Sequence, residues 1–426
     1  MVVVTNGRPT ARLARMSGRD ADEQHRAATP LELLFDLAFV IAFGQAANGL
    51  AGFIAHGQWA VGLGAFAFAV FAITWAWINY SWFASAFDTD DWLYRLTTMV
   101  QMVGVVIVAL GLPPMFASLE LAAEAQTPVV VDNGIMVAGY VVMRLAMLTQ
   151  WLRAAAQAPE LRRTALTYAL FLALAQVGWL WVLVAQLPLG TAMLAGIALL
   201  LVEIAGPAIA ERGNQTPWHA HHIVERYSLL AIIALGEIVV GTVISVSAVV
   251  EELGWSLDAA LLALSGIAIA FAMWWIYFLH DHAPTLHRRR NARAFVWGYG
   301  SIVVFGSIAA VGAGLHVAAY TIEDPEHVPA LWAVLAIAVP LALYVVALLL
   351  ISTAMQGWTK HSAHLTGAVI ALAALAFAIV LAAGGLSLSW CVLVVVLAPV
   401  ALIVADEVDA ARALREGRDR LGAARD

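Results

Sequence analysis

The sequence has 426 residues, of which 62% are hydrophobic and 12% charged, with a formal net charge of −7. Soluble proteins carry about a quarter charged residues, so this chain has too few polar groups to cover its own surface. Lipid must therefore be the solvent for much of it, and we predict an all-α integral membrane protein. The single cysteine, Cys391, excludes an intramolecular disulfide and a cysteine-based metal cluster.

Several partners and chemistries are disfavoured by what the sequence lacks. It has no basic block with interleaved aromatic residues, which argues against nucleic acid as a partner. It also lacks a phosphate-binding loop, a nucleophile elbow and an HExxH motif. We therefore expect no cofactor and no catalytic residues.

The first 29 residues are polar and Arg-rich, and we expect them to form a disordered cytoplasmic tail. A charged stretch at 406–426 is expected to be a second cytoplasmic tail. A spanning helix needs about 20 predominantly apolar residues, and this length predicts twelve spans between the tails. They are 31–55, 59–83, 95–117, 133–153, 163–187, 189–211, 222–250, 257–279, 295–320, 329–353, 362–384 and 387–405.

The distribution of basic residues tests this assignment, because cytoplasmic segments collect Arg and Lys. Every second connection and both tails are basic, whereas the alternate connections are neutral or acidic. Only Arg144 and Arg226 fall within proposed spans. The basic residues of the connections and tails are Arg8, Arg12, Arg15, Arg19, Arg26, Arg95, Arg153, Arg162, Arg163, Arg212, Arg288, Arg289, Arg290, Arg293, Lys360, Arg412, Arg415, Arg418, Arg420 and Arg425. This alternation supports twelve spans with both termini in the cytoplasm.

The two halves of the chain, 30–211 and 212–405, resemble each other. Ala42–Gln45 in the first span resembles Ala234–Glu237 in the seventh, and Trp77–Tyr80 in the second resembles Trp275–Phe278 in the eighth. Six spans per half give both halves the same orientation, so we predict two parallel six-helix repeats, an arrangement known from transporters. Trp75, Trp77 and four other tryptophans near span ends fit an aromatic belt at the membrane interface.

Ionisable residues within spans are costly and are the best functional candidates. Glu32 and Asp36 open the first span on one helix face. The helix dipole alone favours an acid at the position of Glu32, but less so at Asp36. Arg144 in the fourth span needs a partner, and we expect Asp36, at a similar depth, to supply it.

Glu237 in the middle of the seventh span lies next to Gly236, where a helix or ligand can approach. A buried, lone glutamate can carry a proton. Arg226 is on nearly the same face, but about 16 Å away by helical rise, too far for a direct pair. Glu203 in the sixth span is a further candidate partner.

A histidine-rich segment precedes Arg226. His221 and Glu225 lie four residues apart, as do His222 and Arg226, and this spacing can bind zinc. No second cluster is visible, and we do not predict a metal site there.

A cluster of carboxylates follows the second span. Asp88, Asp90 and Asp91 either cap the next helix, with an Asp91–Arg95 pair, or gather a cation. We favour the capping role.

Three motifs together resemble the bacterial low temperature requirement protein A family: Thr29–Val40, Phe87–Asp91 with Arg95, and His222–Arg226 continuing to Ile232–Glu237. The resemblance carries over Glu32, Asp36, Asp88, Asp90, Asp91, Arg95, His222, Glu225, Arg226, Gly236 and Glu237. It implies a multi-pass protein of the cell membrane and a phenotype, growth in the cold, rather than a biochemical activity.

The residues favour a transporter or an ion- or proton-coupled permease for an unknown small solute or ion. Asp36 and Glu237 would carry the coupling ion, with Arg144 or Arg226 as counter-charge. The alternatives are a membrane sensor or scaffold for cold or envelope stress, and an intramembrane lipid-modifying enzyme. The sequence leaves the substrate and the oligomeric state open.

Overall fold

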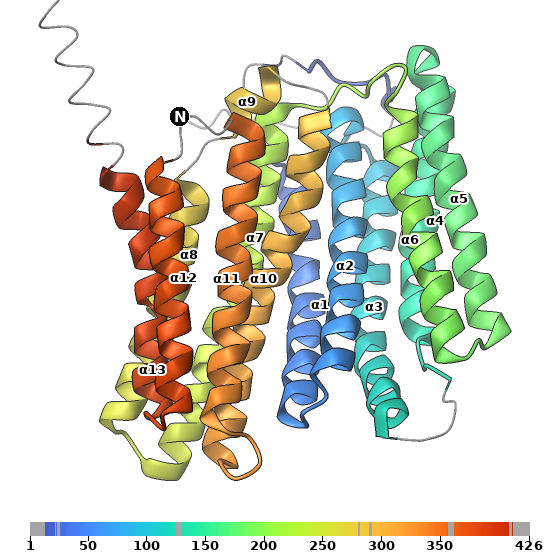
Figure 1. Cartoon of the computed structure of the whole chain (residues 1–426). Helices are drawn as coiled ribbons and strands as arrows, with labels where there is room; N and C mark the ends of the chain where they lie inside the picture. Colours follow the sequence, from blue (N-terminus) through green and yellow to red (C-terminus); the bar gives the residue numbers. More distant parts are fainter. Residues whose placement is uncertain are drawn as a thin grey trace, which may run out of the picture. The chain divides into compact units, whose positions relative to one another are not determined.

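A computed structural model describes residues 13–21, 23, 26–124, 130–279, 282–288, 292–356, 362–408 and 411. This part of the chain is helical and contains no strand (Figure 1). The helices are α1 (Pro30–Ala55), α2 (Trp59–Phe87), α3 (Trp92–Glu124), α4 (Gly134–Gln157), α5 (Arg162–Ala185), α6 (Leu189–Ala210), α7 (Ala220–Leu253), α8 (Leu257–Phe278), α9 (Ala283–Arg288), α10 (Ala292–Glu323), α11 (Ala330–Gln356), α12 (Ser362–Ala383) and α13 (Leu388–Val395), with a 3₁₀ turn, η1 (Pro159–Leu161), before α5. Twelve helical stretches in the described residues are long and apolar enough to cross a membrane, which confirms the predicted fold class.

Local backbone chemistry separates the spans where the sequence is almost continuously apolar. Gln186 ends α5 in the left-handed conformation (φ 44°), and Pro188 precedes α6. Gly385, at φ 86°, ends α12: its N–H donates to the carbonyl of Ala382, and that of Leu386 donates to Leu381. This is the Schellman arrangement, in which glycine tolerates a positive φ without a steric penalty. Both apolar runs thus form two spans each.

The last span is interrupted, which the sequence did not predict. α13 ends at Val395, Val396 adopts a turn, and helix resumes from Leu397 to Val408. Pro399 has no N–H to donate to the carbonyl of Val395, so the break falls one turn before the proline. In contrast, Pro113 and Pro114 lie inside a continuous α3.

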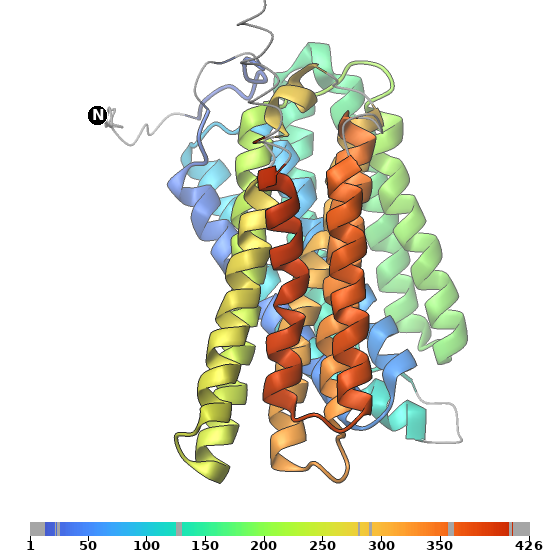
Figure 2. The same ribbon diagram turned by 60° about the vertical axis from the view of Figure 1, so that its left-hand side comes forward.

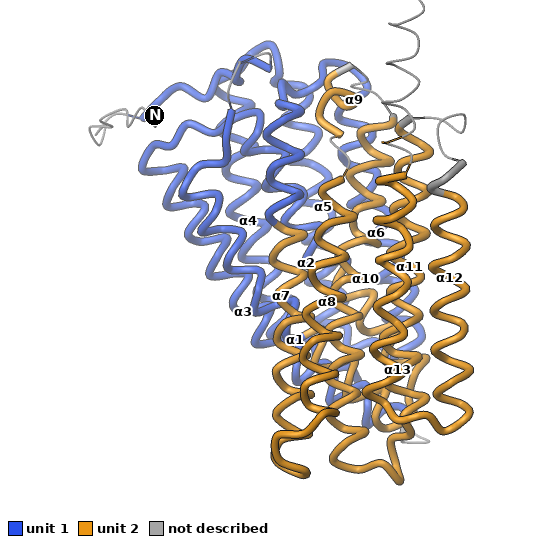
Figure 3. Tube along the Cα trace, turned by 90° about the vertical axis from the view of Figure 1, so that its left-hand side faces the viewer, with its two compact units in different colours: residues 1–45, 71–229 blue, residues 46–70, 230–426 orange. Residues whose placement is uncertain are grey.

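The chain divides into two compact units (Figure 3). Unit 1 contains residues 1–45 and 71–229, and unit 2 contains 46–70 and 230–426. The division passes through α1, α2 and α7, so the units do not coincide with the two consecutive six-helix halves. The repeat stays a prediction.

Unit 1 contains a run of neighbouring helices, in which α3 packs on α4, α4 on α5, and α5 on α6. The α3–α4 contact is close because glycines face it: a Cβ added to Gly139 would lie 2.5 Å from the backbone nitrogen of Val108. Small residues allow such helix approach within a membrane. α6 is the least buried of the spans, so most of its surface is left to lipid.

Unit 2 is built around α10, the most buried span. α10 packs on α11, α11 packs on α12, and α13 lies beside both α12 and α8 (Figure 2). A Cβ added to Gly314 would lie 2.5 Å from the backbone of Ala336 on α11, and one on Gly312 would lie 2.7 Å from the backbone of Glu237 on α7. The glycines of α10 therefore set its distance from two neighbours.

The described part of the N-terminal segment packs on the helices of unit 1, to which it belongs, although we expected residues 1–29 to be disordered. Met16 and Arg26 are buried. The backbone N–H of Arg19 donates to the carbonyl of Ala86 (2.9 Å), and that of Ala14 donates to Asp91 (3.1 Å). Residues 1–12, and those of the C-terminal tail at 412–426, lie outside the described residues.

Candidate functional site

Glu32 has a structural role at the start of α1. The backbone N–H of Glu32 donates to Thr29 Oγ1 (3.3 Å), and the backbone N–H of Thr29 donates to Glu32 Oε2 (2.7 Å). This reciprocal pair is a capping box, with Pro30 at the first helical position, where its missing N–H costs nothing. The sequence Thr29–Glu32 therefore fixes where α1 begins.

The same Glu32 carboxylate also reaches α7 and is fully buried there. Its Oε1 lies 3.1 Å from Nε2 of His222 and 3.1 Å from Nη1 of Arg226. His222 and Arg226 lie on one face of α7, because residues four apart stack along a helix. Glu32 therefore links α1 to α7.

Asp36, one turn further along α1, makes the second link. Arg226 donates from Nε to Asp36 Oδ2 (3.1 Å) and from Nη2 to Oδ1, a two-point contact that favours Arg over Lys. Trp77 on α2 donates its indole N–H to the same carboxylate (2.6 Å). The expectation that Asp36 pairs with Arg144 is wrong, because Arg226 holds it.

Aromatic rings complete this cluster. One of them, Trp77, was predicted to belong to an aromatic belt at the membrane interface. The Arg226 guanidinium lies 5.6 Å from the ring centres of both Trp77 and Tyr80, within cation–π range. Trp75 and Trp77 are fully buried, so they do not belong to an interfacial belt.

Arg26 and Asp88 lie beside Glu32 at the same end of the cluster. Arg26 is 4% exposed, donates to the carbonyl of Ala84 (2.8 Å), and has Nη2 3.7 Å from Glu32 Oε1 and 3.9 Å from Asp88 Oδ2. Burial, and then the nearby Glu32 carboxylate, raise the pKa of Asp88 to about 6, against the opposing effect of Arg26. Sequence reasoning missed Arg26 because it lay in the segment expected to be disordered.

The Asp88–Asp91 motif caps α3 but pairs differently from the prediction. Asp91 accepts the backbone N–H of Tyr94 (2.9 Å) at the start of α3 and forms an ion pair with Arg153. Arg95 makes a two-point contact with Asp90, at 2.8 and 2.7 Å, instead of with Asp91. Since each carboxylate already has a partner, the motif supports capping and helix connection rather than cation binding.

Arg144 belongs to a separate buried cluster between α4, α5 and α6. It donates to Glu203 Oε2 (2.7 Å), which also accepts the Tyr140 hydroxyl (2.6 Å), while Trp179 donates to Glu203 Oε1 (3.0 Å). A small cavity of about 10 Å³ beside Glu203, lined also by Trp75 and Asn79, has room for about one water. Glu203, a secondary candidate in the sequence, is the partner that Arg144 requires.

The histidines before Arg226 have different surroundings. His219 lies 2.8 Å from the carbonyl of Glu23, His221 is exposed, and Glu225 accepts the backbone N–H of Ala28 (3.0 Å). Burial lowers the pKa of His219. Within the described parts of the chain, no group of three His, Cys, Asp or Glu could hold a metal ion.

Glu237 stands apart from these paired residues. It is 4% exposed in the middle of α7, and among the described residues it has neither a hydrogen bond nor an ion pair. Gly312 of α10 lies directly against its backbone, and His316, one turn further along α10, lies beside Gly241. His316 Nδ1 is 3.4 Å from Asn48 Oδ1.

These motifs lie within a segment that matches a known family. Residues 27–399 match the family described as bacterial low temperature requirement A protein. The chain belongs to this family. The low temperature requirement A match covers both clusters apart from Arg26, together with Glu237 and all twelve spanning stretches except the end of the last. It confirms a bacterial multi-pass membrane protein.

Relatives add little about the activity of this low temperature requirement A protein. It is 24% identical over 314 residues, 70% of each chain, to an uncharacterized protein of Rhizobium meliloti (strain 1021). No solved structure matches it. Its function must therefore be argued from its own residues.

Proposed function

We propose that this protein is a proton-coupled transporter of the cell membrane, with Glu237 as the proton-carrying group and both termini in the cytoplasm. The observation that carries the proposal is the burial of Glu237 without a partner among the described residues. Ionisable residues inside spanning helices are rare and mark ion pathways or proton relays.

The other intramembrane acids support this choice by contrast. Glu32 and Asp36 both face the cation Arg226, Glu32 also contacts the imidazole of His222, and Glu203 faces Arg144. A carboxylate in a tight buried ion pair cannot release its partner without leaving a charge uncompensated. In this proposal the paired acids hold helices together, and Glu237 alone is available to take up and release a proton.

The surroundings of Glu237 also suit a group that must be reached by an ion or solute. Gly236 has open space around its Cβ position, whereas Gly312 places the backbone of α10 against that of Glu237. Two polar side chains, Asn48 and His316, lie on helices of the same unit. Of these two, the imidazole of His316 is a group that can act as a proton shuttle.

Proton flux into liposomes containing the purified protein tests the proposal. We expect Glu237→Gln to abolish solute-dependent flux, Glu237→Asp to retain part of it, and Glu251→Gln, which changes an exposed acid at the end of the same helix, to leave it unchanged. If the parent protein and Glu237→Gln give equal flux, Glu237 is structural. If the parent gives none with candidate solutes under several gradients, the sensor or enzyme hypotheses gain weight.

A further inference from the structure

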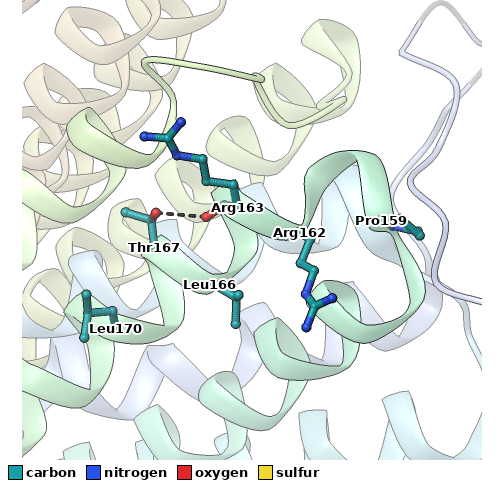
Figure 4. Close-up of a pocket in the computed structure, with 6 residues that line it drawn as sticks. All are labelled: Pro159, Arg162, Arg163, Leu166, Thr167 and Leu170. Carbon is teal, nitrogen blue, oxygen red and sulfur yellow. Dashed lines mark hydrogen bonds between the residues drawn. The ribbon is translucent and has the colours of Figure 1, made fainter.

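The start of α5 carries a concave surface of about 480 Å³ that no part of the proposed transport mechanism uses. It is lined by Pro159, Arg162, Arg163, Leu166, Thr167 and Leu170 (Figure 4). The two guanidinium groups extend to different sides of the first turn, and the leucines follow further along the helix. The surface is thus cationic at one end and apolar at the other.

Both arginines are free to bind an external anion. They are exposed, and neither forms an ion pair with another residue in the described parts of unit 1. Exposed Glu160 pairs with neither of them. Glu211, the acid of the adjacent connection, is occupied by neutral donors: the Tyr168 hydroxyl at 2.9 Å, and Thr216 at 2.9 and 2.7 Å.

The apolar end of the surface continues along the helix. An exposed apolar stripe runs the length of α5 at helical spacing, formed by Leu166, Leu170, Leu174, Val177, Trp181 and Val184. The opposite face, with Ala165, Ala169 and Leu172, is buried. On a membrane-spanning helix, such a stripe is in contact with acyl chains.

We propose that Arg162 and Arg163, with Leu166 and Leu170, form a binding site for an anionic glycerophospholipid. The phosphate of the headgroup accepts hydrogen bonds from the guanidinium of Arg162, which shares a helix face with Leu166 and Leu170, and an acyl chain lies along these leucines. Arg163, on the other side of the turn, adds a second positive charge. Arg is suited to this role because its planar fork binds phosphate at two points. Basic pockets at the ends of spanning helices favour anionic lipid by charge, whereas zwitterionic lipid adds no net attraction.

Lipid retention by the full-length protein tests the site. Native mass spectrometry counts bound dioleoyl phosphatidylglycerol and dioleoyl phosphatidylcholine after detergent exchange, and lipid titration gives an apparent Kd. We expect the parent to retain phosphatidylglycerol selectively. The double variant Arg162→Gln, Arg163→Gln should raise the apparent Kd for phosphatidylglycerol by about tenfold or more, because it removes charge-assisted hydrogen bonds. The double variant Arg162→Lys, Arg163→Lys should bind with intermediate affinity.

Arg212→Gln is the matched control, because it removes one exposed arginine outside the lining of the surface. Equal losses in Arg212→Gln and in each single variant, Arg162→Gln and Arg163→Gln, would overturn the proposal, since any cation would then serve. Equal retention of phosphatidylcholine would overturn it as well. Competition by soluble glycerol phosphate at the same Kd would show that the ligand is a free phosphate and not a lipid.

Discussion

Arg226 of α7 contacts both carboxylate oxygens of Asp36 on α1, and neither side chain is accessible to solvent. The pair is extended by Trp77, which donates to Asp36, and by Glu32, which contacts Arg226. Two elements that are distant in the sequence are thus joined by charge within the apolar part of the fold. The stability of unit 1 should depend on keeping these charges balanced.

Replacing one partner should be more harmful than replacing both. Asp36→Asn or Arg226→Gln alone leaves a buried, uncompensated charge, and each should destabilise the protein by about 3–5 kcal/mol. The double variant should lose less than the sum of the two. Thermal denaturation of the parent, the two single variants and the double variant in detergent measures this coupling. The control is Arg95→Gln, in an exposed pair with Asp90, which should cost only about 0–1 kcal/mol. Strictly additive losses would show that the two side chains do not interact.

The pH dependence of stability should contain a contribution from Asp88. Its pKa is about 6 in the folded protein, above the ordinary 3.8, so the native state holds the proton more tightly than the unfolded state does. This contribution is fully present below pH about 4 and is lost as the pH rises through about 6, by at most about 3 kcal/mol. Stability of the parent minus that of Asp88→Asn, measured from pH 4 to 7.5, should therefore fall with rising pH. A flat difference would contradict the assignment.

The capping box at the start of α1 should contribute measurably. Thr29→Ala removes the acceptor for the N–H of Glu32 and should cost about 1 kcal/mol. Thr29→Ser keeps the hydroxyl and should behave like the parent. The midpoint of thermal unfolding compares the three proteins, and indistinguishable Ala and Ser variants would show that the hydroxyl is not used.

Two glycines near Glu237 should respond oppositely to the same substitution. A Cβ at Gly312 would lie 2.7 Å from the backbone of Glu237, so Gly312→Ala should force α7 and α10 apart and cost about 1–3 kcal/mol. A Cβ at Gly236 meets nothing within 4 Å. Gly236→Ala should therefore be neutral or stabilising, because alanine favours helix. Unfolding in detergent separates the two, and equal effects would contradict the close approach at Gly312.

The amino-acid sequence by itself determined the number and approximate limits of the spans. Span length and hydrophobicity are set by the bilayer, and turn formers such as Pro188 and Gly385 act locally, so both can be recognised in one dimension. The same reasoning identified Asp36, Arg144, Arg226 and Glu237 as unusual, because a charge in an apolar run is visible without a structure.

Only the tertiary structure decided which of these charges meet. Asp36 pairs with Arg226 and Arg144 with Glu203, whereas depth alone had suggested Asp36 with Arg144. Depth in the membrane follows from residue number, but pairing requires two helices to be neighbours and turned toward each other. Neighbour relations and helix rotation come from packing between distant segments, and this also buried Trp77 and Arg26 and left Glu237 without a partner among the described residues.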